Sequence, residues 1–183
     1  MVELLLEAGA VPDQGDDLAT PVWFAARYGH REIIERLVEA GASIGAPRGC
    51  DPDDGPVFEA VRRGHLAVLE YLVQRGVDLA VRDTWQRTLL HLAVIEGHLA
   101  VVRWLLGRVT ADATDRDGRT ALHYAAQGDQ VEIARALIEG GASPEAVTKR
   151  GWTPLQTAVA DNSTEVAALL VESVADPFSE DTV

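Results

Sequence analysis

Five histidines are the residues of this sequence best suited to chemistry, because an imidazole can bind a metal ion or act as a general base near neutral pH. They recur in two settings: His91 and His123 lie in Thr-x-x-His segments, whereas His30, His65 and His98 directly follow a glycine. Each setting repeats about every 33 residues, so each histidine occupies the same point of a repeating segment. This regularity predicts structural histidines that bond the backbone of an adjacent loop. We expect no metal ligand and no catalytic residue among them.

Other reactive groups are isolated in the sequence. The single cysteine, Cys50, cannot form an internal disulfide and supplies too few sulfur ligands for a thiolate metal site, which favours a reducing compartment such as the cytoplasm or the nucleus. Lys149 has no glycine-rich phosphate loop before it. Carboxylates are numerous, and we expect them on solvated helix faces and turns. The sequence therefore predicts a protein that is not an enzyme and needs no cofactor.

Charge narrows the range of partners. The 183 residues carry 16 Lys and Arg against 29 Asp and Glu, a net charge of −13 at pH 7. Such a charge opposes nonspecific attraction to nucleic-acid backbones and anionic lipid surfaces. Hydrophobic residues make up 47% of the chain, as in an ordinary folded protein, but no stretch approaches the roughly 20 apolar residues of a membrane span. We therefore expect one domain or a short repeat array that binds neither membranes nor bulk nucleic acid.

Three markers repeat along the chain in a constant order. The first is a six-residue segment that begins with Thr or Gly and ends with Ala, the second is a glycine or its substitute four residues later, and the third is a glycine near the end of the unit. The first marker comprises residues 20–25, 55–60, 88–93, 120–125 and 153–158, the second Gly29, Gly64, Gly97, Asp129 and Asn162, and the third Gly41, Gly76 and Gly141. Successive copies start about 32 to 35 residues apart, which indicates five copies of one unit.

Each unit predicts two short helices. Threonine at the start supplies an N-cap, and Pro21 or Pro154 after it begins a helix at a position that needs no N–H donor. This first helix, helix A, runs about eight residues to the second marker, where glycine can take positive φ and reverse the chain. The second helix, helix B, shows apolar residues at helical spacing, such as Ile34 and Leu37. Because no such pair can bury its apolar face alone, the units must stack and share one core.

With three markers in register across five units, the chain resembles the ankyrin-repeat family over nearly its whole length. The resemblance implies an all-α solenoid in which the loops between units are β-turn fingers set at right angles to the helices. We expect a single array over residues 1–175, with a half repeat at 1–15 and five units that start near residues 16, 50, 83, 115 and 148, followed by an acidic flexible tail at 176–183. The half repeat is either a true cap or the start of a fragment of a longer array.

Several positions depart from the repeating pattern. Val109 and Val174 occupy the place of the glycine that ends helix B, and Asp129 and Asn162 stand where positive φ is expected. Asparagine tolerates this conformation, which explains Asn162 better than the glycosylation sequon that it begins. For Asp129 we expect that replacement by glycine relieves strain and leaves the free energy of unfolding unchanged or higher. The finger at residues 44–54 is rich in Gly, Pro and Asp, and we expect it to be longer and more mobile than the others.

The function that the resemblance implies is protein binding, usually on a concave face made by the fingertips and the exposed side of helix A. Carried over position by position, the acidic fingertips contribute Asp16, Asp17 and Asp54, the basic fingertips Trp85, Arg87, Arg116, Arg119, Lys149, Arg150 and Trp152, and the helix A side Arg27, Tyr28, Arg62 and Arg63. Trp, Tyr and Arg are the residue types enriched in interface hot spots. The competing interpretation is that both tryptophans pack within turns and that the arginines pair with neighbouring aspartates, namely Asp83, Asp115 and Asp117.

We therefore predict a monomeric, non-catalytic module that binds a partner protein with complementary acidic and basic regions, whose identity the sequence leaves open. Two alternatives stay open at this point. The arginine fingertips suit contact with a nucleic acid, which a salt titration distinguishes because phosphate binding weakens steeply with salt. The array also suits a regulatory domain of a larger enzyme.

Overall fold

The computed structural model of the chain describes residues 8–13, 20–45 and 55–175. It forms two compact units, Met1–Thr84 and Trp85–Val183, which are described in turn. Within the described residues every regular element is a helix, so the predicted all-α repeat fold is confirmed. The tail at 176–183 and most of the long finger at 44–54 lie outside the described residues, as do Cys50 and most of the half repeat at 1–15.

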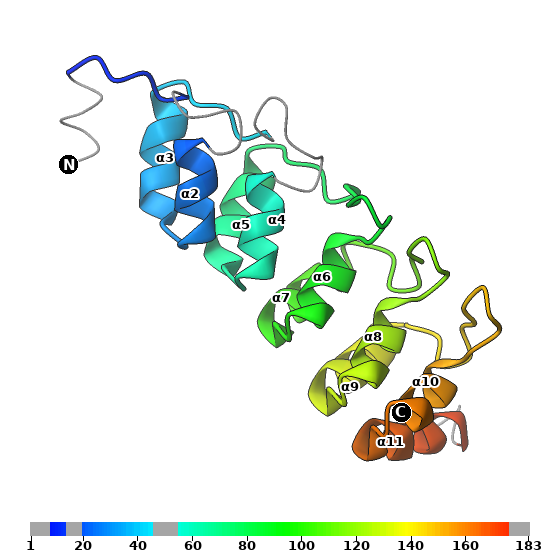
Figure 1. The fold of residues 1–183 in the computed structure, drawn as a ribbon. Coiled ribbons are helices and arrows are strands. Elements are labelled where there is room, and N and C mark those ends of the chain that lie inside the picture. Colours follow the sequence, from blue (N-terminus) through cyan, green and yellow to red (C-terminus); the bar gives the residue numbers. More distant parts are fainter. Residues whose placement is uncertain (1–7, 14–19, 46–54, 176–183) are drawn as a thin grey trace. The chain divides into compact units, whose positions relative to one another are not determined.

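The described residues of the first unit form two helix pairs (Figure 1). Helices α2 (Pro21–Arg27) and α3 (Arg31–Glu39) pack against each other, as do α4 (Pro56–Arg62) and α5 (Leu66–Gln74). The pairs stack through contacts of α2 with α4 and of α3 with α5. Ile34, Phe58, Leu69 and Leu72 are fully buried between them, which places apolar side chains of both pairs in a shared core.

The second unit repeats this arrangement three times (Figure 1). Its pairs are α6 (Leu89–Ile95) with α7 (Leu99–Leu105), α8 (Ala121–Gln127) with α9 (Val131–Glu139), and α10 (Pro154–Ala160) with α11 (Thr164–Ala175). The first helices stack in the order α6, α8 and α10, and the second helices in the order α7, α9 and α11. Leu90, Leu122, Leu137 and Leu170 belong to its buried core. The small residues Ala93, Ala125 and Ala158 have no exposed surface, which lets neighbouring helices approach closely.

The helix starts follow the predicted capping chemistry. Thr20 Oγ1 accepts a hydrogen bond from the Trp23 N–H at 3.2 Å, and Thr153 Oγ1 accepts one from the Gln156 N–H at 3.2 Å. Proline occupies the first turn of α2, α4 and α10. After each helix A one residue has positive φ, and these residues are Gly29, Gly64, Gly97, Asp129 and Asn162. The predicted chain reversals are therefore confirmed, including the two at non-glycine residues.

Helix α7 ends earlier than the sequence pattern indicates. It has seven residues and stops at Leu105, whereas α3, α5 and α9 have nine. Gly107 takes a φ of +81°, and the N–H groups of Arg108 and Val109 both donate to the Leu105 carbonyl. The prediction that Val109 stands at the helix-ending position is wrong, because Gly107 can adopt the left-handed conformation two residues before it.

Helix α11 is longer than the sequence pattern indicates. It has 12 residues and continues through Val174 to Ala175, beyond the Val171 at which the apolar pattern of the last helix B ends. Val174 therefore does not end this helix. No glycine lies in or directly after the segment, so nothing favours a left-handed turn there.

Asp129 has a second role that backbone conformation alone does not indicate. Its φ is +49°, as predicted, and its Oδ1 accepts a hydrogen bond from the Val166 N–H at 3.0 Å. Val166 lies in the first turn of α11, so the carboxylate of one repeat caps a helix of the next. A carboxylate at this place satisfies an N–H that has no partner within the helix and lies near the positive end of the helix dipole. The expectation that Asp129→Gly preserves stability therefore no longer holds.

We expect Asp129→Gly to lower the free energy of unfolding by about 0.5–1 kcal/mol. Loss of the cap costs about 1 kcal/mol and glycine adds freedom to the unfolded chain, which together outweigh the relief of a left-handed conformation that Asp tolerates. Asp129→Asn keeps an oxygen acceptor and should stay within about 0.5 kcal/mol of the wild type. Urea unfolding followed by helical circular dichroism measures both. A stabilised glycine variant would show that the cap contributes nothing.

Candidate functional site

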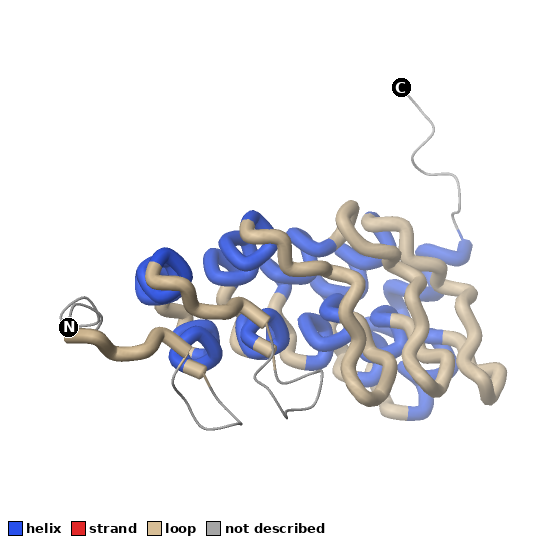
Figure 2. The backbone as a smooth tube through the Cα atoms, turned by 90° about the horizontal axis from the view of Figure 1, so that it is seen from above, coloured by secondary structure: helices blue, strands red, loops and turns tan. Residues whose placement is uncertain are grey.

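Three fingers of the second unit lie side by side. They precede α6, α8 and α10 and comprise residues 85–88, 115–120 and 148–153 (Figure 2). The Arg116 N–H donates to the Trp85 carbonyl at 2.9 Å, and the Lys149 N–H donates to the Asp117 carbonyl at 2.9 Å. The two bonds correspond to each other, because Trp85 and Asp117 hold one repeat position and Arg116 and Lys149 hold another. The backbone of each finger is thereby fixed against the next.

Each finger turns through a residue in the left-handed region. The residues at this point are Gln86 (φ +62°), Gly118 (φ +79°) and Gly151 (φ +76°). A Cβ at Gly118 would lie 2.8 Å from the Lys149 nitrogen, while one at Gly151 would meet nothing within 4 Å. Gly118 thus serves two needs, because it supplies the positive φ and lets the α10 finger approach. Gln86 takes the repeat position of these two glycines and adopts their positive φ, although glutamine rarely does so.

Asp115 closes the α8 finger from within. Its Oδ1 accepts hydrogen bonds from the N–H groups of Asp117 (2.8 Å) and Arg119 (2.9 Å), and its Oδ2 accepts one from the Tyr124 hydroxyl at 2.6 Å. Burial by itself would raise the pKa of Asp115, but the hydrogen bonds from Tyr124 and the backbone outweigh it and the pKa is lowered. Burial and the bond to Asp115 raise the pKa of Tyr124 to about 12. The carboxylate therefore stays ionised while its oxygens are used inside the finger.

Two buried histidines anchor the fingers to the helices. Nδ1 of His91 accepts the Thr88 N–H at 3.1 Å, and Nδ1 of His123 accepts the Thr120 N–H at 3.1 Å. A backbone N–H can only donate, so the ring proton lies on Nε2. This Nε2–H donates to the Arg119 carbonyl from His91 (3.0 Å) and to the Trp152 carbonyl from His123 (2.9 Å). Each histidine thus bridges the start of its own helix A and the finger of the following repeat.

The predicted structural role is confirmed for these two histidines and for His65. In the first unit, Nε2 of His65 lies 3.0 Å from the Arg27 carbonyl. The His30 ring stacks on Tyr28 with ring centroids 6.4 Å apart, and the role of His98 stays a prediction. Among the described residues no group of three or more His, Cys, Asp or Glu side chains is arranged to hold a metal ion.

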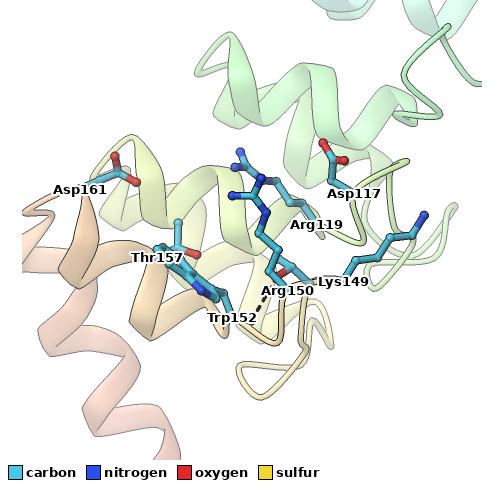
Figure 3. Close-up of a pocket in the computed structure, with 8 residues that line it drawn as sticks. Asp117, Arg119, Lys149, Arg150, Trp152, Thr157 and Asp161 are labelled. Carbon is cyan, nitrogen blue, oxygen red and sulfur yellow. Dashed lines mark hydrogen bonds between the residues drawn. The ribbon is translucent and has the colours of Figure 1, made fainter.

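Four of the predicted contact residues line one groove of the second unit. This groove, called the Trp152 groove below, has a volume of about 230 Å³. It is lined by Asp117, Arg119, Thr148, Lys149, Arg150, Trp152, Thr157 and Asp161 (Figure 3). Trp152 is 46% exposed. Asp117, Thr148, Thr157 and Asp161 are not among the predicted contact residues. The available signal for Asp161 is its repeat position, which corresponds to that of the predicted residues Tyr28 and Arg63, whereas Thr157 is buried.

The other predicted fingertip residues lie outside this groove. Trp85 is 52% exposed, and the Arg116 guanidinium lies over its ring, 4.9 Å from the centroid. Arg87 is half-buried. Asp16, Asp17 and Asp54 lie outside the described residues.

Arg119 is held by neutral groups and not by the neighbouring Asp115. Arg119 donates from Nη1 to Gln127 Oε1 at 3.3 Å and lies 5.7 Å from the centroid of the Tyr124 ring. The carboxylate of Asp115 accepts from Tyr124 and the backbone instead. Both tryptophans are about half exposed, so each presents a large apolar surface to solvent.

The helix A side of the first unit is built around a buried carboxylate. Glu59 is 6% exposed, and its oxygens lie 3.6 Å from Arg27, 3.3 Å from Arg62 and 3.9 Å from Arg63. Arg27 also lies over the Trp23 ring at 5.2 Å. The predicted residues Arg27, Arg62 and Arg63 are thus brought together, and the exposed Tyr28 follows directly after Arg27.

Glu59 corrects the expectation that carboxylates lie on solvated faces. Asp83 and Asp115 are likewise buried. In the repeat register Glu59 takes the place held by Phe24, Leu92, Tyr124 and Thr157, so a charge at a position that is uncharged in the other repeats was the available signal. Its burial follows from the three guanidinium groups around it, because a buried charge must be paired.

A Gly-x-Ser-x-Gly segment at residues 41–45 matches the pattern of a nucleophile elbow but has another role. It follows helix α3 instead of joining a strand to a helix. The Ser43 N–H donates to Asp13 Oδ1 at 2.8 Å, and Ser43 Oγ accepts the Gly45 N–H at 3.3 Å. Ser143 makes the same pair of bonds in the second unit, with Asp112 and Glu145. The serine is therefore a repeated turn element.

Comparison with known families agrees with this architecture. The family model described as "Ankyrin repeats (3 copies)" matches residues 90–181, and the one described as "Ankyrin repeats (many copies)" matches residues 22–73 and 57–106. The chain belongs to the ankyrin-repeat family. Ankyrin repeats are typically protein–protein interaction modules and generally not catalytic. No curated protein matches the chain, and no helix in the described part of the chain is long and apolar enough to cross a membrane.

The close approach at Gly118 predicts an unequal pair of alanine variants. Gly118→Ala and Gly151→Ala each place a side chain at positive φ, which costs about 1 kcal/mol. Only Gly118→Ala also forces a Cβ against the Lys149 nitrogen, so we expect a total loss of at least about 2 kcal/mol for this variant. Denaturant unfolding of both variants measures the difference. Equal losses would mean that the two fingers separate at no cost.

The burial of His123 predicts a dependence of stability on pH. Burial lowers its pKa below the ordinary value of 6.5, so the unfolded chain binds a proton more readily than the folded one. The stability contributed by neutral His123 is present above pH 6.5 and is lost as the pH falls towards the lowered pKa. Gln156 occupies the same capping position in the next repeat and accepts the Thr153 N–H at 2.9 Å, so His123→Gln keeps a cap but does not titrate.

We expect the wild type to exceed His123→Gln in unfolding free energy by about 1 kcal/mol at pH 7.5, the contribution of one buried hydrogen bond. This difference should shrink as the pH is lowered to 5. Urea titrations at several pH values measure it. A difference that stays constant from pH 7.5 to 5 would contradict the assignment of a neutral, buried ring.

Proposed function

We propose that this chain is a non-catalytic module that binds a partner protein through its fingertips and the exposed side of helix A. The observation that carries the proposal is the pair of half-exposed tryptophans, Trp85 and Trp152, on fingers whose backbones are fixed. A tryptophan in solvent is a large apolar surface that a monomer gains nothing by exposing. Fixed backbones lower the entropy lost on binding, which favours recognition at these residues.

The arginines beside the tryptophans can make directional hydrogen bonds across such an interface. Arg116 lies over Trp85, and Arg119 is oriented by Gln127 and Tyr124, so both guanidinium groups are ordered before binding. Ordered arginines beside tryptophans are typical of interface hot spots. A partner with acidic groups opposite these arginines fits the surface best.

Catalysis is not supported by the polar groups of the repeats. Both ring nitrogens of His91 and His123 are engaged with backbone groups, and Asp115 uses its oxygens inside its own finger. Groups already saturated by structural bonds are unavailable as acid, base or ligand. Contact with nucleic acid is also less favoured, because the net charge is −13 and two carboxylates line the Trp152 groove.

Affinity purification with the whole chain, followed by mass spectrometry, identifies the partner. The double variant Trp85→Ala with Trp152→Ala should then weaken binding by at least about 2 kcal/mol, roughly 30-fold, without loss of helical circular dichroism. Charge reversal at Arg116 and Arg119 should slow association, and the effect should shrink as salt screens it.

The controls lie on helix B. Trp104→Ala removes a half-buried tryptophan of α7, and Glu35→Ala and Glu39→Ala change polar residues of α3. We expect these variants to change affinity by less than twofold. The proposal is falsified if the helix B variants abolish binding while the tryptophan double variant binds normally.

A further inference from the structure

The Trp152 groove gathers positive charge on a protein that is strongly negative overall. Arg119, Lys149 and Arg150 line it together with two carboxylates, Asp117 and Asp161. No ion pair joins any of these five groups within the part of the chain that the structure describes. The three cations exceed the two carboxylates of the groove by one positive charge, although the whole chain carries a net charge of −13.

Two of the cations line the groove from neighbouring fingers. Figure 3 shows the side chains of Arg119 and Arg150 extending in the same direction from the α8 and α10 fingers. The Arg119 guanidinium is held by Gln127 Oε1 at 3.3 Å and by the Tyr124 ring, which are both neutral. Two guanidinium groups on one side of a groove repel each other unless an anion lies with them. A carboxylate suits this place because it accepts two parallel N–H bonds from an arginine.

The shape of the groove favours a peptide over an enclosed small molecule. Pockets for small ligands usually have volumes of about 300–1,000 Å³ and enclose most of the ligand. The Trp152 groove has only about 230 Å³ and opens to solvent. Trp152 contributes a half-exposed ring beside the cations, on which an apolar side chain can pack. A segment of extended chain, with side chains that enter the groove singly, fits these dimensions.

The two aspartates restrict the charge pattern of that segment. Asp117 and Asp161 line the same groove as the cations, so a continuous run of negative charge would meet repulsion from both. An acidic side chain between neutral or basic neighbours avoids this repulsion. The same argument disfavours a nucleic-acid backbone, in which every unit carries a charge.

We propose that the Trp152 groove binds a peptide segment of the partner protein in which one or two acidic side chains contact Arg119 and Arg150, next to an apolar side chain that packs on Trp152, with neutral or basic residues on either side. This inference rests on the proposed protein-binding function and adds the chemistry of the partner. The acidic side chains are carboxylates, and tighter binding of a phosphoserine peptide would overturn this assignment.

A phage-displayed library of random 12-residue peptides provides the first test, with the whole chain as bait. We expect the selected peptides to be enriched in Asp or Glu next to an apolar residue and to lack long acidic runs. The same selection on the double variant Arg119→Ala with Arg150→Ala should lose this enrichment. Selection of no peptide, or of peptides whose acidic content is the same with both baits, overturns the proposal.

Binding of one selected peptide, labelled with rhodamine and followed by fluorescence anisotropy, provides the second test. We expect Arg150→Ala to weaken binding at least tenfold. The matched control is Arg135→Ala, which removes one exposed arginine from helix α9 away from the groove and should change the affinity by less than twofold. If the two variants weaken binding equally, the peptide responds to the net charge of the protein and not to the groove, which would overturn the assigned site.

Two further probes identify the source of the negative charge. Replacing the acidic residues of the peptide by glutamine should weaken binding at least tenfold, and replacing them by phosphoserine shows whether phosphate is preferred to carboxylate. Tighter binding of a labelled 12-nucleotide oligothymidylate, lost in Arg150→Ala, would overturn the proposal in favour of nucleic acid.

The outcome also separates this inference from the proposed function. A partner whose binding depends on Trp85 and Trp152 but not on Arg119 and Arg150 would leave the protein-binding function intact and refute only the acidic segment. If neither the tryptophan variants nor the arginine variants weaken binding, both the proposed function and the acidic segment are refuted.

Discussion

In the second unit, the hydrogen bonds of His91 and His123 tie the start of one helix to the finger of the following repeat. Each ring accepts from the backbone of its own repeat and donates to a carbonyl about 30 residues later. A helix pair of this size has too little apolar area to be stable alone, so its position must come from its neighbours. The imidazole supplies a directional bond where the apolar contacts supply none. In the second unit these bonds fix each finger to the helix of the preceding repeat.

This constraint explains why the fingers can vary in sequence and still lie side by side. Arg119 and Trp152 occupy equivalent positions, and in both cases it is the carbonyl group, not the side chain, that the histidine holds. The bonds between fingers likewise use only backbone atoms. Side chains at these positions are therefore not needed for the fold. They can be charged, aromatic or polar, which leaves them available for recognition.

The features that sequence reasoning predicts well are those set by local chemistry. Threonine caps, prolines at helix starts and positive φ at Asp129 and Asn162 each follow from a residue type and its neighbours. Helix α7 ends early, at Leu105, two residues before Gly107 with its positive φ, whereas the strict repeat length predicts an end at Val109. A repeat register predicts where a helix should end, whereas the nearest residue able to adopt a left-handed conformation decides where it does end.

Specific side-chain contacts of the folded chain could not be predicted from the sequence. The capping of α11 by Asp129, the burial of Glu59 under arginines and the presence of Asp117 and Asp161 in the Trp152 groove all join residues whose proximity depends on side-chain directions in the folded chain. The repeat register does place such residues on the same side of the array. It does not say which of them meet, because a change of one side chain redirects its neighbours.

Two clusters of arginines in this protein differ in the groups that contact them, and this difference decides how well each can bind an anion. Arg27, Arg62 and Arg63 lie around the buried carboxylate of Glu59, which offsets part of their charge.

Arg119 is held instead by the amide of Gln127 and the ring of Tyr124, which order the guanidinium without offsetting its charge. The carboxylate that lies nearby in sequence, Asp115, is used by Tyr124 and the backbone. An arginine that is ordered by neutral groups gives up little entropy on binding and can still form two parallel hydrogen bonds with an anion. On a chain with a net charge of −13, such a place attracts an acidic segment only where the local groups outweigh the long-range repulsion, so contact depends on a close fit and not on charge alone.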